Sequence, residues 1–178
     1  MKWFIASDIH GSAFWCERLL EAFAEENADK LLLLGDILYH GPRNDFPQDY
    51  APKKVFAMLN AVKDKITCIR GNCDSEVDQM VLQFPILADY ALLPIGKKTL
   101  YLSHGHLPLP PLGESFIVVG GHTHFAERKQ LDSGVTCLND GSVSLPKEGK
   151  PNGCMLVEGN RLSWINLQTG EAFDTTEI

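Results

Sequence analysis

Short apolar runs alternate with amphipathic helical patterns in the first half of this chain of 178 residues. The apolar runs cover residues 3–7, 31–34 and 66–69, and the helical patterns lie between them at residues 12–27 and 52–63. Strands that are separated by such helices pair in parallel. The first half therefore predicts a β-α-β-α-β unit with a parallel sheet.

Both predicted helices carry a start signal. Ser12 is a suitable N-cap for the first helix, and Pro52 suits the first turn of the second. Apolar residues recur at helical spacing behind each signal. They are Trp15, Leu19, Leu20, Phe23, Val55, Phe56, Leu59 and Val62.

Hairpin signals replace the helical patterns in the second half of the chain. Tight turns are predicted at Gly96-Lys97-Lys98, Asp132-Ser133-Gly134 and Gly159-Asn160. The extended segments cover residues 90–95, 99–103, 116–119, 127–131, 135–138, 155–157 and 162–165. We expect these segments to form a second sheet. The chain length suits one domain, so we predict a single α/β domain over residues 1–178, a four-layer α-β-β-α sandwich of two mixed sheets.

Composition limits the function classes. The 16 Lys and Arg against 23 Asp and Glu leave a formal charge of −7, which opposes binding to a long nucleic acid. Apolar runs such as residues 31–34 are far shorter than the roughly 20 residues of a membrane span, and residues 1–8 lack a signal-peptide core. The five cysteines are widely spaced without a Cys-x-x-Cys pair. We expect a cytoplasmic protein that does not enter a membrane.

Side chains that can bind metals stand at the ends of five predicted strands. They are Asp8 and His10 after residues 3–7, Asp36 after 31–34, Asn72 after 66–69, His104 after 99–103, and His122 and His124 after 116–119. Residues beyond the carboxyl ends of strands in a layered α/β domain converge on one edge. The glycines beside them allow sharp turns and close backbone approaches. These glycines are Gly11, Gly35, Gly71, Gly105 and Gly121. We expect a metal site at that edge.

Each short motif also has an ordinary alternative role. Asp8-Ile9-His10, Gly35-Asp36 and Gly71-Asn72 suit turns and caps as well as metal binding. Gly121-His122-Thr123-His124 is more specific, because two imidazoles one residue apart on an extended segment point the same way. Five such motifs at strand ends favour a metal centre. Carboxylate, imidazole and amide ligands suit divalent Mn, Fe, Co or Zn.

In this order the five motifs resemble the signature of the calcineurin-like metallophosphoesterases, which is Asp-x-His, Gly-Asp, Gly-Asn, His and Gly-His-x-His. The match extends from Asp8 to His124. The run Asn139-Asp140-Gly141-Ser142-Val143 adds a resemblance to the small bacterial phosphodiesterase branch of this family, the YfcE-like proteins.

The resemblance implies a centre of two divalent metal ions, with Mn favoured and Zn, Fe, Co or Ni as alternatives. One ion would bind Asp8, His10 and His124, the other Asn72, His104 and His122, and Asp36 would bridge them. Such a pair activates a bridging hydroxide for in-line attack on phosphorus. The implied function is a dimetal phosphoric ester hydrolase, a phosphodiesterase that acts on a small phosphodiester.

The pattern departs from larger family members at Cys73, which stands where those proteins have a histidine that protonates the leaving oxygen. A thiol replaces that imidazole poorly, so Cys73 either lines the leaving-group side or is a half-buried neighbour of a ligand. His106 is a candidate proton donor, with a turn histidine as the alternative. Arg43 and His40 are the candidate substrate-binding residues, because their loop follows Asp36; a solvated loop is the alternative.

Two other functions share this pattern. A phosphomonoesterase would use the same dimetal core, although the missing second histidine and the short loops favour diesters. A non-catalytic interaction scaffold, like the retromer subunit of the same fold, would have lost ligands, whereas every expected position here holds a competent side chain. The resemblance also favours a homo-oligomer.

Overall fold

The computed structural model describes residues 1–177. Its first half contains the predicted elements in the predicted order, namely β1 (Lys2–Ala6), α1 (Ala13–Glu25), β2 (Lys30–Leu33), α2 (Pro52–Ala61) and β3 (Ile66–Cys68). Strand β2 pairs in parallel with both β1 and β3. The parallel β-α-β-α-β unit is therefore confirmed.

The start signals of both long helices are confirmed. The Ser12 hydroxyl accepts a hydrogen bond of 3.3 Å from the backbone N–H of Trp15, and Pro52 lies in the first turn of α2. Two short helical elements were not predicted. A 3-10 helix covers Lys63–Lys65, and α3 covers Glu76–Gln79. Neither is long enough to repeat an apolar face, so the sequence contains no helical periodicity for them.

The second half is built from strands. They are β4 (Tyr90–Ile95), β5 (Lys98–Ser103), β6 (Phe116–Gly120), β7 (Glu127–Gln130), β8 (Thr136–Asn139), β9 (Gly153–Glu158), β10 (Arg161–Asn166) and β11 (Ala172–Glu177). Five of them form one mixed sheet in the order β4-β5-β6-β8-β7. The hairpins β4–β5 and β7–β8 are antiparallel as predicted, and β6 pairs in parallel with β5 and β8.

The prediction that every hairpin belongs to this second sheet is wrong for β9 and β10. They join the first sheet, whose order is β11-β10-β9-β1-β2-β3. Strand β9 pairs antiparallel with β1, so that Ile5 lies opposite Met155. Strand β2 covers only one edge of β1, and an uncovered second edge would leave backbone N–H and C=O groups unpaired. A turn signal specifies a hairpin but not the sheet edge that it joins.

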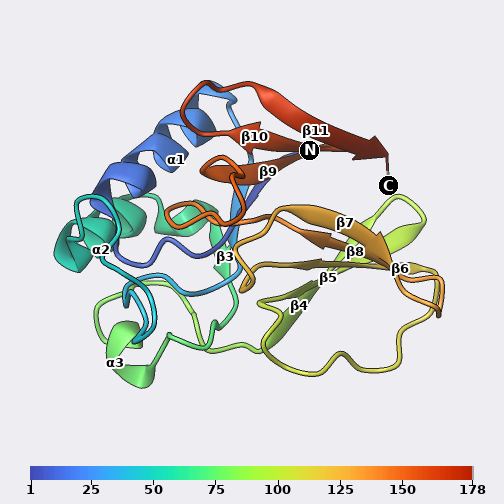
Figure 1. Ribbon diagram of the computed structural model, residues 1–178, viewed down its shortest axis with the longest axis horizontal. Coiled ribbons are helices and arrows are strands. Elements are labelled where there is room, and N and C mark those ends of the chain that lie inside the picture. The colour runs from blue at the N-terminus through green and yellow to red at the C-terminus, as the bar shows by residue number, and fades with distance from the viewer. Residues whose placement is uncertain (178) are drawn as a thin grey trace.

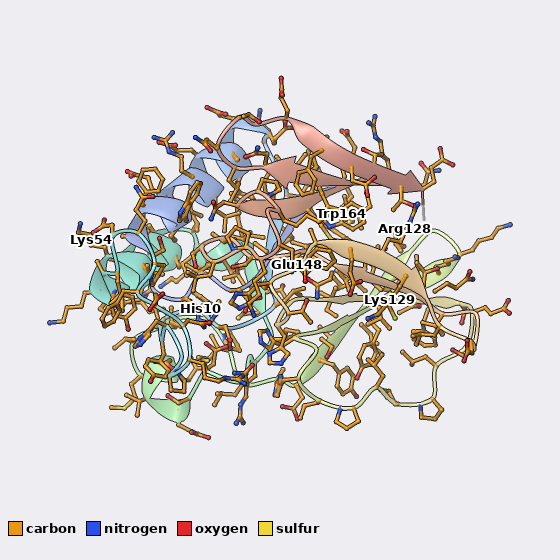
Figure 2. The ribbon with its side chains drawn as sticks, in the orientation of Figure 1. His10, Lys54, Arg128, Lys129, Glu148 and Trp164 are labelled. Carbon is orange, nitrogen blue, oxygen red and sulfur yellow. The ribbon has the colours of Figure 1, made fainter. Side chains whose placement is uncertain are left out.

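The two mixed sheets pack face to face, as the predicted sandwich requires. In Figure 1, β9 to β11 run across the top, and β4 to β8 lie below them. An apolar cluster fills the space between the sheets, and Ile5, Leu102, Val119 and Trp164 belong to it. Trp164 is labelled in Figure 2. This cluster holds the two sheets, and with them their strand ends, in fixed positions.

Helices α1 and α2 cover the outer face of the six-stranded sheet and lie together at the left of Figure 1. Phe4 packs toward the helices while its neighbour Ile5 packs toward the other sheet, because successive strand residues point to opposite faces. A smaller apolar cluster on the outer face of the five-stranded sheet includes Tyr101 and Val118. Leu112, in the loop between β5 and β6, packs against it. Among residues 1–177, no helix has the length and hydrophobicity to cross a membrane.

Candidate metal centre

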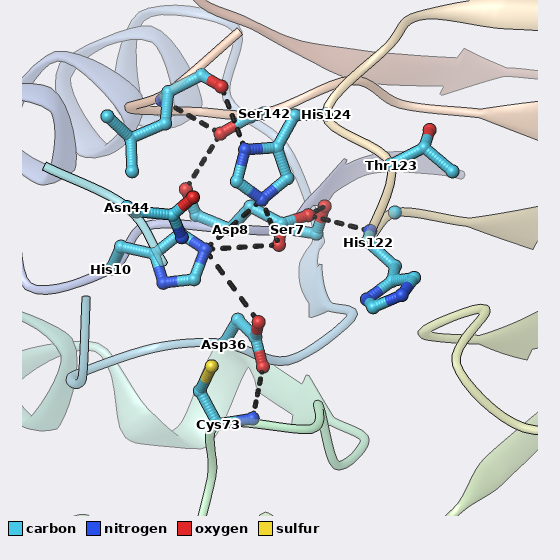
Figure 3. A network of polar contacts seen from close by, with 12 residues as sticks. Ser7, Asp8, His10, Asp36, Asn44, Cys73, His122, Thr123, His124 and Ser142 are labelled. Carbon is cyan, nitrogen blue, oxygen red and sulfur yellow. Dashed lines mark hydrogen bonds and ion pairs between the residues drawn. The ribbon is translucent and has the colours of Figure 1, made fainter. Parts of the chain in front are cut away.

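The ends of five strands bring the predicted ligands to one edge of the sandwich. Asp8 and His10 follow β1, Asp36 follows β2, Asn72 follows β3, His104 follows β5, and His122 and His124 follow β6. The side chains of Asp8, His10, Asp36 and His124 point toward one another (Figure 3). Both sheets therefore contribute side chains to a single cluster.

Two glycines allow the loops of this edge to approach closely. A Cβ atom on Gly71 would collide with the carboxylate of Asp36. A Cβ atom on Gly121 would collide with Ser7 and with the carboxylate of Asp8. Glycine is therefore required sterically in the Gly71-Asn72 and Gly121-His122 pairs. A larger residue in place of either glycine would push its loop away from the neighbouring carboxylate.

Five of the seven predicted ligands have a left-handed backbone. The φ angles are 57° at Asp8, 48° at His10, 56° at Asp36, 67° at His122 and 62° at His124. This conformation costs an L-residue roughly 1–2 kcal/mol, and it persists only where the surroundings enforce it. Hydrogen bonds between the loops provide that constraint, since the N–H of Asp8 donates to Gly35 O at 3.1 Å and the N–H of His10 donates to Asp36 O at 2.9 Å.

Asp8, His10 and His124 form a first group of ligand atoms. The Oδ1 atom of Asp8 lies 3.4 Å from Nε2 of His10 and 3.2 Å from Nε2 of His124, and these nitrogens are 3.2 Å apart. Ligand atoms that bind one ion at about 2.1 Å lie about 3.0–3.4 Å from one another. The Oδ1 atom of Asp8 is buried and has no hydrogen-bond partner among residues 1–177. The group therefore fits one divalent cation.

Backbone carbonyls orient the three buried histidine rings. The Nδ1 atoms of His10, His104 and His124 lie 2.8 Å from the carbonyl oxygens of Tyr39, Leu34 and Leu145, respectively. Each Nδ1–H donates to its carbonyl, so the Nε2 atom of each ring faces the carboxylates. This arrangement is common for metal-binding histidines, because the outer hydrogen bond fixes the tautomer and the ring plane.

Asp36 lies between the first group and His104. Its Oδ2 atom is 3.7 Å from Nε2 of His10 and 3.4 Å from Nε2 of His104. The Oδ1 atom of Asn72 lies 3.1 Å from the same His104 nitrogen. The second carboxylate oxygen of Asp36 accepts a hydrogen bond of 2.8 Å from the N–H of Cys73. Asp36 thus occupies the position that a ligand shared by two ions needs.

His122 and His106 lie beside this second group. The ring centroid of His122 is 5.1 Å from that of His104, and the N–H of His122 donates to Oδ2 of Asp8 at 3.0 Å. The ring centroid of His106 is 5.4 Å from that of His104 and 6.2 Å from that of His122. The Nδ1 atom of His106 is buried without a partner in the described part of the chain.

The carboxylates and the imidazoles shift one another's pKa. Burial favours the neutral form of Asp8, but the neighbouring imidazoles of His10 and His124 outweigh burial and hold the pKa of Asp8 well below its usual value. Burial also lowers the pKa of a histidine, but Asp36 and Asp8 outweigh it and raise the pKa of His104 to about 9. The pKa of His10 is raised in the same way by Asp8. Positive charge is therefore favoured between these groups, as a proton or as a metal ion.

A cavity of about 470 Å³ opens over the cluster. Its walls are formed by His10, Asp36, Gly41, Pro42, Arg43, Asn44, Asn72, Cys73, His122, Thr123, His124 and Lys147. This volume is that of a small-molecule site. Arg43 and Lys147 are exposed and add positive charge to the wall.

The structure changes the list of residues at the mouth. Lys147 was not predicted, because it lies in a loop without a motif; its N–H donates to the carbonyl of His124 at 2.9 Å. His40 is not among the residues that line the cavity, and its ring packs against Phe46 and Tyr50. Substrate binding by His40 therefore stays a prediction.

Three buried polar side chains behind the ligands were also not predicted, namely Ser7, Asp74 and Asp140. Ser7 contacts Asp8 and Asp140, and Asp74 contacts the backbone of Asp36. Their proximity to motif residues in the sequence was the only signal. Ser7 precedes Asp8, Asp74 follows Asn72 by two residues, and Asp140 lies in the run that resembles the bacterial branch.

This chain is similar to known proteins in sequence and in structure. The family model of the calcineurin-like phosphoesterase superfamily domain matches residues 1–161. Phosphodiesterase YfcE of Escherichia coli strain K12 is 47% identical over 171 residues, which cover 94% of this chain and 92% of the relative. A solved structure of Yfce, a phosphoesterase from E. coli, has a TM-score of 0.94 and 45% identity, with 100% of both chains covered.

A more distant neighbour shares the fold. It is a mutant of Vps29 from Entamoeba histolytica, with a TM-score of 0.63, 20% identity and coverage of 100% of this chain and 99% of the other. The family model covers all five motifs at the edge of the sandwich, and the relative and the solved structure cover 94% and 100% of this chain. This chain belongs to the calcineurin-like phosphoesterase superfamily.

Proposed function

We propose that this protein is a metal-dependent phosphodiesterase that hydrolyses a small phosphodiester. The observation that carries the proposal is the position of the Asp36 carboxylate, 3.7 Å from His10 Nε2 and 3.4 Å from His104 Nε2, between two groups of nitrogen and oxygen ligands. The similarity to a protein called phosphodiesterase YfcE supports the substrate class. The cavity of about 470 Å³ suits a small substrate rather than a polymer.

The residues fit two divalent ions. Asp8, His10 and His124 would hold one ion, Asn72, His104 and His122 the other, and Asp36 both. The unpartnered Oδ1 of Asp8 supports this assignment. We favour Mn²⁺, as the resemblance to this family implies; nitrogen and oxygen donors suit Zn²⁺, Fe²⁺, Co²⁺ and Ni²⁺ as well. When bound, a pair of such ions lowers the pKa of water and neutralises charge on phosphoryl oxygens.

Arg43 and Lys147 would hold the phosphoryl oxygens that do not react. They extend the cavity wall with positive charge, and a guanidinium can donate two parallel hydrogen bonds to a phosphate. Such contacts orient the phosphorus for attack from one side and departure on the other.

The leaving oxygen needs a proton unless it is stable as an anion. Burial and the charge of Asp36 raise the pKa of Cys73 to about 12, which makes this thiol a poor donor. His106 supplies an imidazole beside the second group, with its ring centroid 5.4 Å from that of His104 and its Nδ1 without a partner in the described part of the chain, although it does not line the cavity itself. We therefore assign proton donation to His106 and place Cys73 on the leaving-group side of the cavity.

We further propose that residues 1–178 act as one domain in the cytoplasm and form a homo-oligomer. Ligands from both sheets support one domain. The five cysteines are free in residues 1–177, which suits a reducing compartment. Tyr90 and Leu92 on β4 are 52% and 49% exposed, and such apolar surface favours association.

Turnover with and without metal tests the proposal. Protein loaded with Mn²⁺ should hydrolyse bis(para-nitrophenyl) phosphate faster than para-nitrophenyl phosphate, and a chelator should abolish both activities until Mn²⁺ is restored. Asp36→Asn should lower kcat by more than about 100-fold, since even residues behind metal ligands contribute about 10- to 100-fold. Asp64→Asn, at an exposed position on the 3-10 helix, is the control. Faster monoester turnover, or activity that persists with chelator, would overturn the proposal.

A further inference from the structure

One buried hydroxyl lies between two buried carboxyl groups directly behind the metal centre. The Oγ atom of Ser7 is 2.5 Å from Oδ2 of Asp8 and 2.8 Å from Oδ1 of Asp140. The exposed fractions of Ser7, Asp8 and Asp140 are 0%, 0% and 1%. Bulk solvent therefore does not hydrogen-bond to this chain of contacts, so the three side chains must satisfy one another.

A count of protons determines how these groups bond. A serine hydroxyl has one proton, and an ionised carboxylate has none. If both carboxyl groups were ionised, one of the two short oxygen contacts would join lone pairs. A proton on Oδ1 of Asp140 removes this conflict. The carboxylic acid of Asp140 then donates to Ser7 Oγ, and the hydroxyl of Ser7 donates to Oδ2 of Asp8.

The surroundings of Asp140 suit a neutral acid. Its Oδ2 atom is buried and has no hydrogen-bond partner among residues 1–177, which would be costly for an ionised group. Burial and the charge of Asp8 raise the pKa of Asp140 well above its usual value.

The same contacts decide which oxygen of Asp8 faces the metal. Oδ2 of Asp8 receives two donors, the hydroxyl of Ser7 and the N–H of His122 at 3.0 Å. Oδ1 is left to face His10 and His124. We infer that Asp140 is a positioning residue for Asp8. Through Ser7 it holds the carboxylate of Asp8 in the orientation that presents Oδ1 to a metal ion.

The segment that contains Asp140 also holds the backbone of Asp8. The hydroxyls of Ser142 and Ser144 each donate to the carbonyl oxygen of Asp8 at 2.9 Å, and the N–H of Val143 donates to the carbonyl of Ser7 at 3.0 Å. These bonds help to hold the backbone of Asp8 in its left-handed conformation. Residues 140–144 therefore orient both the carboxylate and the backbone of Asp8. The inference rests on the proposed role of Asp8 as a metal ligand.

Metal affinity tests the inference without reference to turnover. Metal-free protein is titrated with Mn²⁺ in competition with a fluorescent chelator. Asp140→Asn keeps a donor toward Ser7 and should bind Mn²⁺ within about twofold of wild type. Asp140→Ala and Asp140→Leu lose the donor and should bind about 10-fold more weakly, the size of effect typical for groups behind metal ligands. Leucine fills the volume of the Asp140 side chain, so Asp140→Leu can be measured if Asp140→Ala does not fold.

Ser7→Ala should weaken binding about as much, and the double variant Ser7→Ala with Asp140→Leu should bind no more weakly than Ser7→Ala alone. Ser163→Ala, which removes a buried hydroxyl on β10 that contacts Thr175, is the matched control and should not change affinity. The inference is wrong if Asp140→Asn binds as weakly as Asp140→Leu, if Asp140→Leu matches wild type, or if the two losses multiply. If wild type itself binds no Mn²⁺, the proposed function fails instead.

Discussion

The carboxylate of Asp74 accepts a hydrogen bond of 2.8 Å from the backbone N–H of Asp36. It also accepts bonds from the N–H groups of Ile37 at 2.9 Å and Gly71 at 2.7 Å. Asp74 therefore joins the loop after β2 to the loop after β3 and holds Asp36 in its left-handed conformation. The position of Asp36, the proposed shared ligand, therefore depends on a buried residue that does not line the cavity.

Removal of this carboxylate should destabilise the protein. Hydrogen bonds to a charged group contribute about 1.5–3 kcal/mol each, so we expect Asp74→Ala to lower the free energy of unfolding by about 3 kcal/mol or more. Urea denaturation measures the loss, and Asp64→Ala on the exposed 3-10 helix should stay within about 0.5 kcal/mol of wild type. An Asp74→Ala protein as stable as this control would show that the three bonds are not needed.

The metal-free protein should lose stability as the pH rises from 6.5 to about 9, because the pKa of His104 rises from 6.5 to about 9 on folding. A raised histidine pKa means that the folded state binds the proton more tightly. The stabilisation is complete below the unfolded pKa and disappears as the pH passes the folded pKa. Thermal unfolding in chelator measures this trend. Added Mn²⁺ should oppose it, since metal competes with the proton. A melting temperature that is flat or rises over this range in chelator would contradict the assignment.

Arg43→Ala should raise the KM for a phosphodiester roughly tenfold, as expected for the loss of a charge-assisted hydrogen bond to phosphate. Steady-state kinetics with bis(para-nitrophenyl) phosphate at saturating Mn²⁺ measures this change. Arg18→Ala is the control, because Arg18 is an exposed arginine on α1 that pairs with Glu21 and does not line the cavity. Unchanged KM and kcat in Arg43→Ala would remove this residue from phosphate binding.

Substrates with different leaving groups should distinguish the role of His106 from that of Cys73. General acid catalysis contributes about 100-fold or more, and only for leaving oxygens that need a proton. His106→Ala should therefore lose about 100-fold in kcat with an alkyl diester and little with a nitrophenyl diester. Cys73→Ala should stay within about twofold on both, since its contact with Asp36 uses the backbone N–H, which alanine keeps. A selective loss on the alkyl diester in Cys73→Ala, without one in His106→Ala, would show that Cys73 is the proton donor.

Local signals predicted the first half of the fold. Ser12 and Pro52 mark the helix starts because capping and the fixed proline φ act within one turn. The gathering of the seven candidate ligands at one edge could also be foreseen, because parallel strands end at the same edge and each motif stands at such an end.

Contacts between distant segments could not be predicted. Strand β9 joins β1 through backbone groups that any sequence has, so no residue type marks this pairing. Strand β11 consists mainly of exposed residues and has no alternating apolar face. The link from Asp140 through Ser7 to Asp8 crosses more than 130 positions and needs the packed structure to be recognised.

The two sheets supply ligands to the same cluster, with Asp36 from one sheet and His104 from the other only 3.4 Å apart. An ion held by both would act as a reversible cross-link at the open rim of the sandwich. Its release would free the loops on either side to separate, so slow amide hydrogen exchange at this rim should report how fully the protein is loaded.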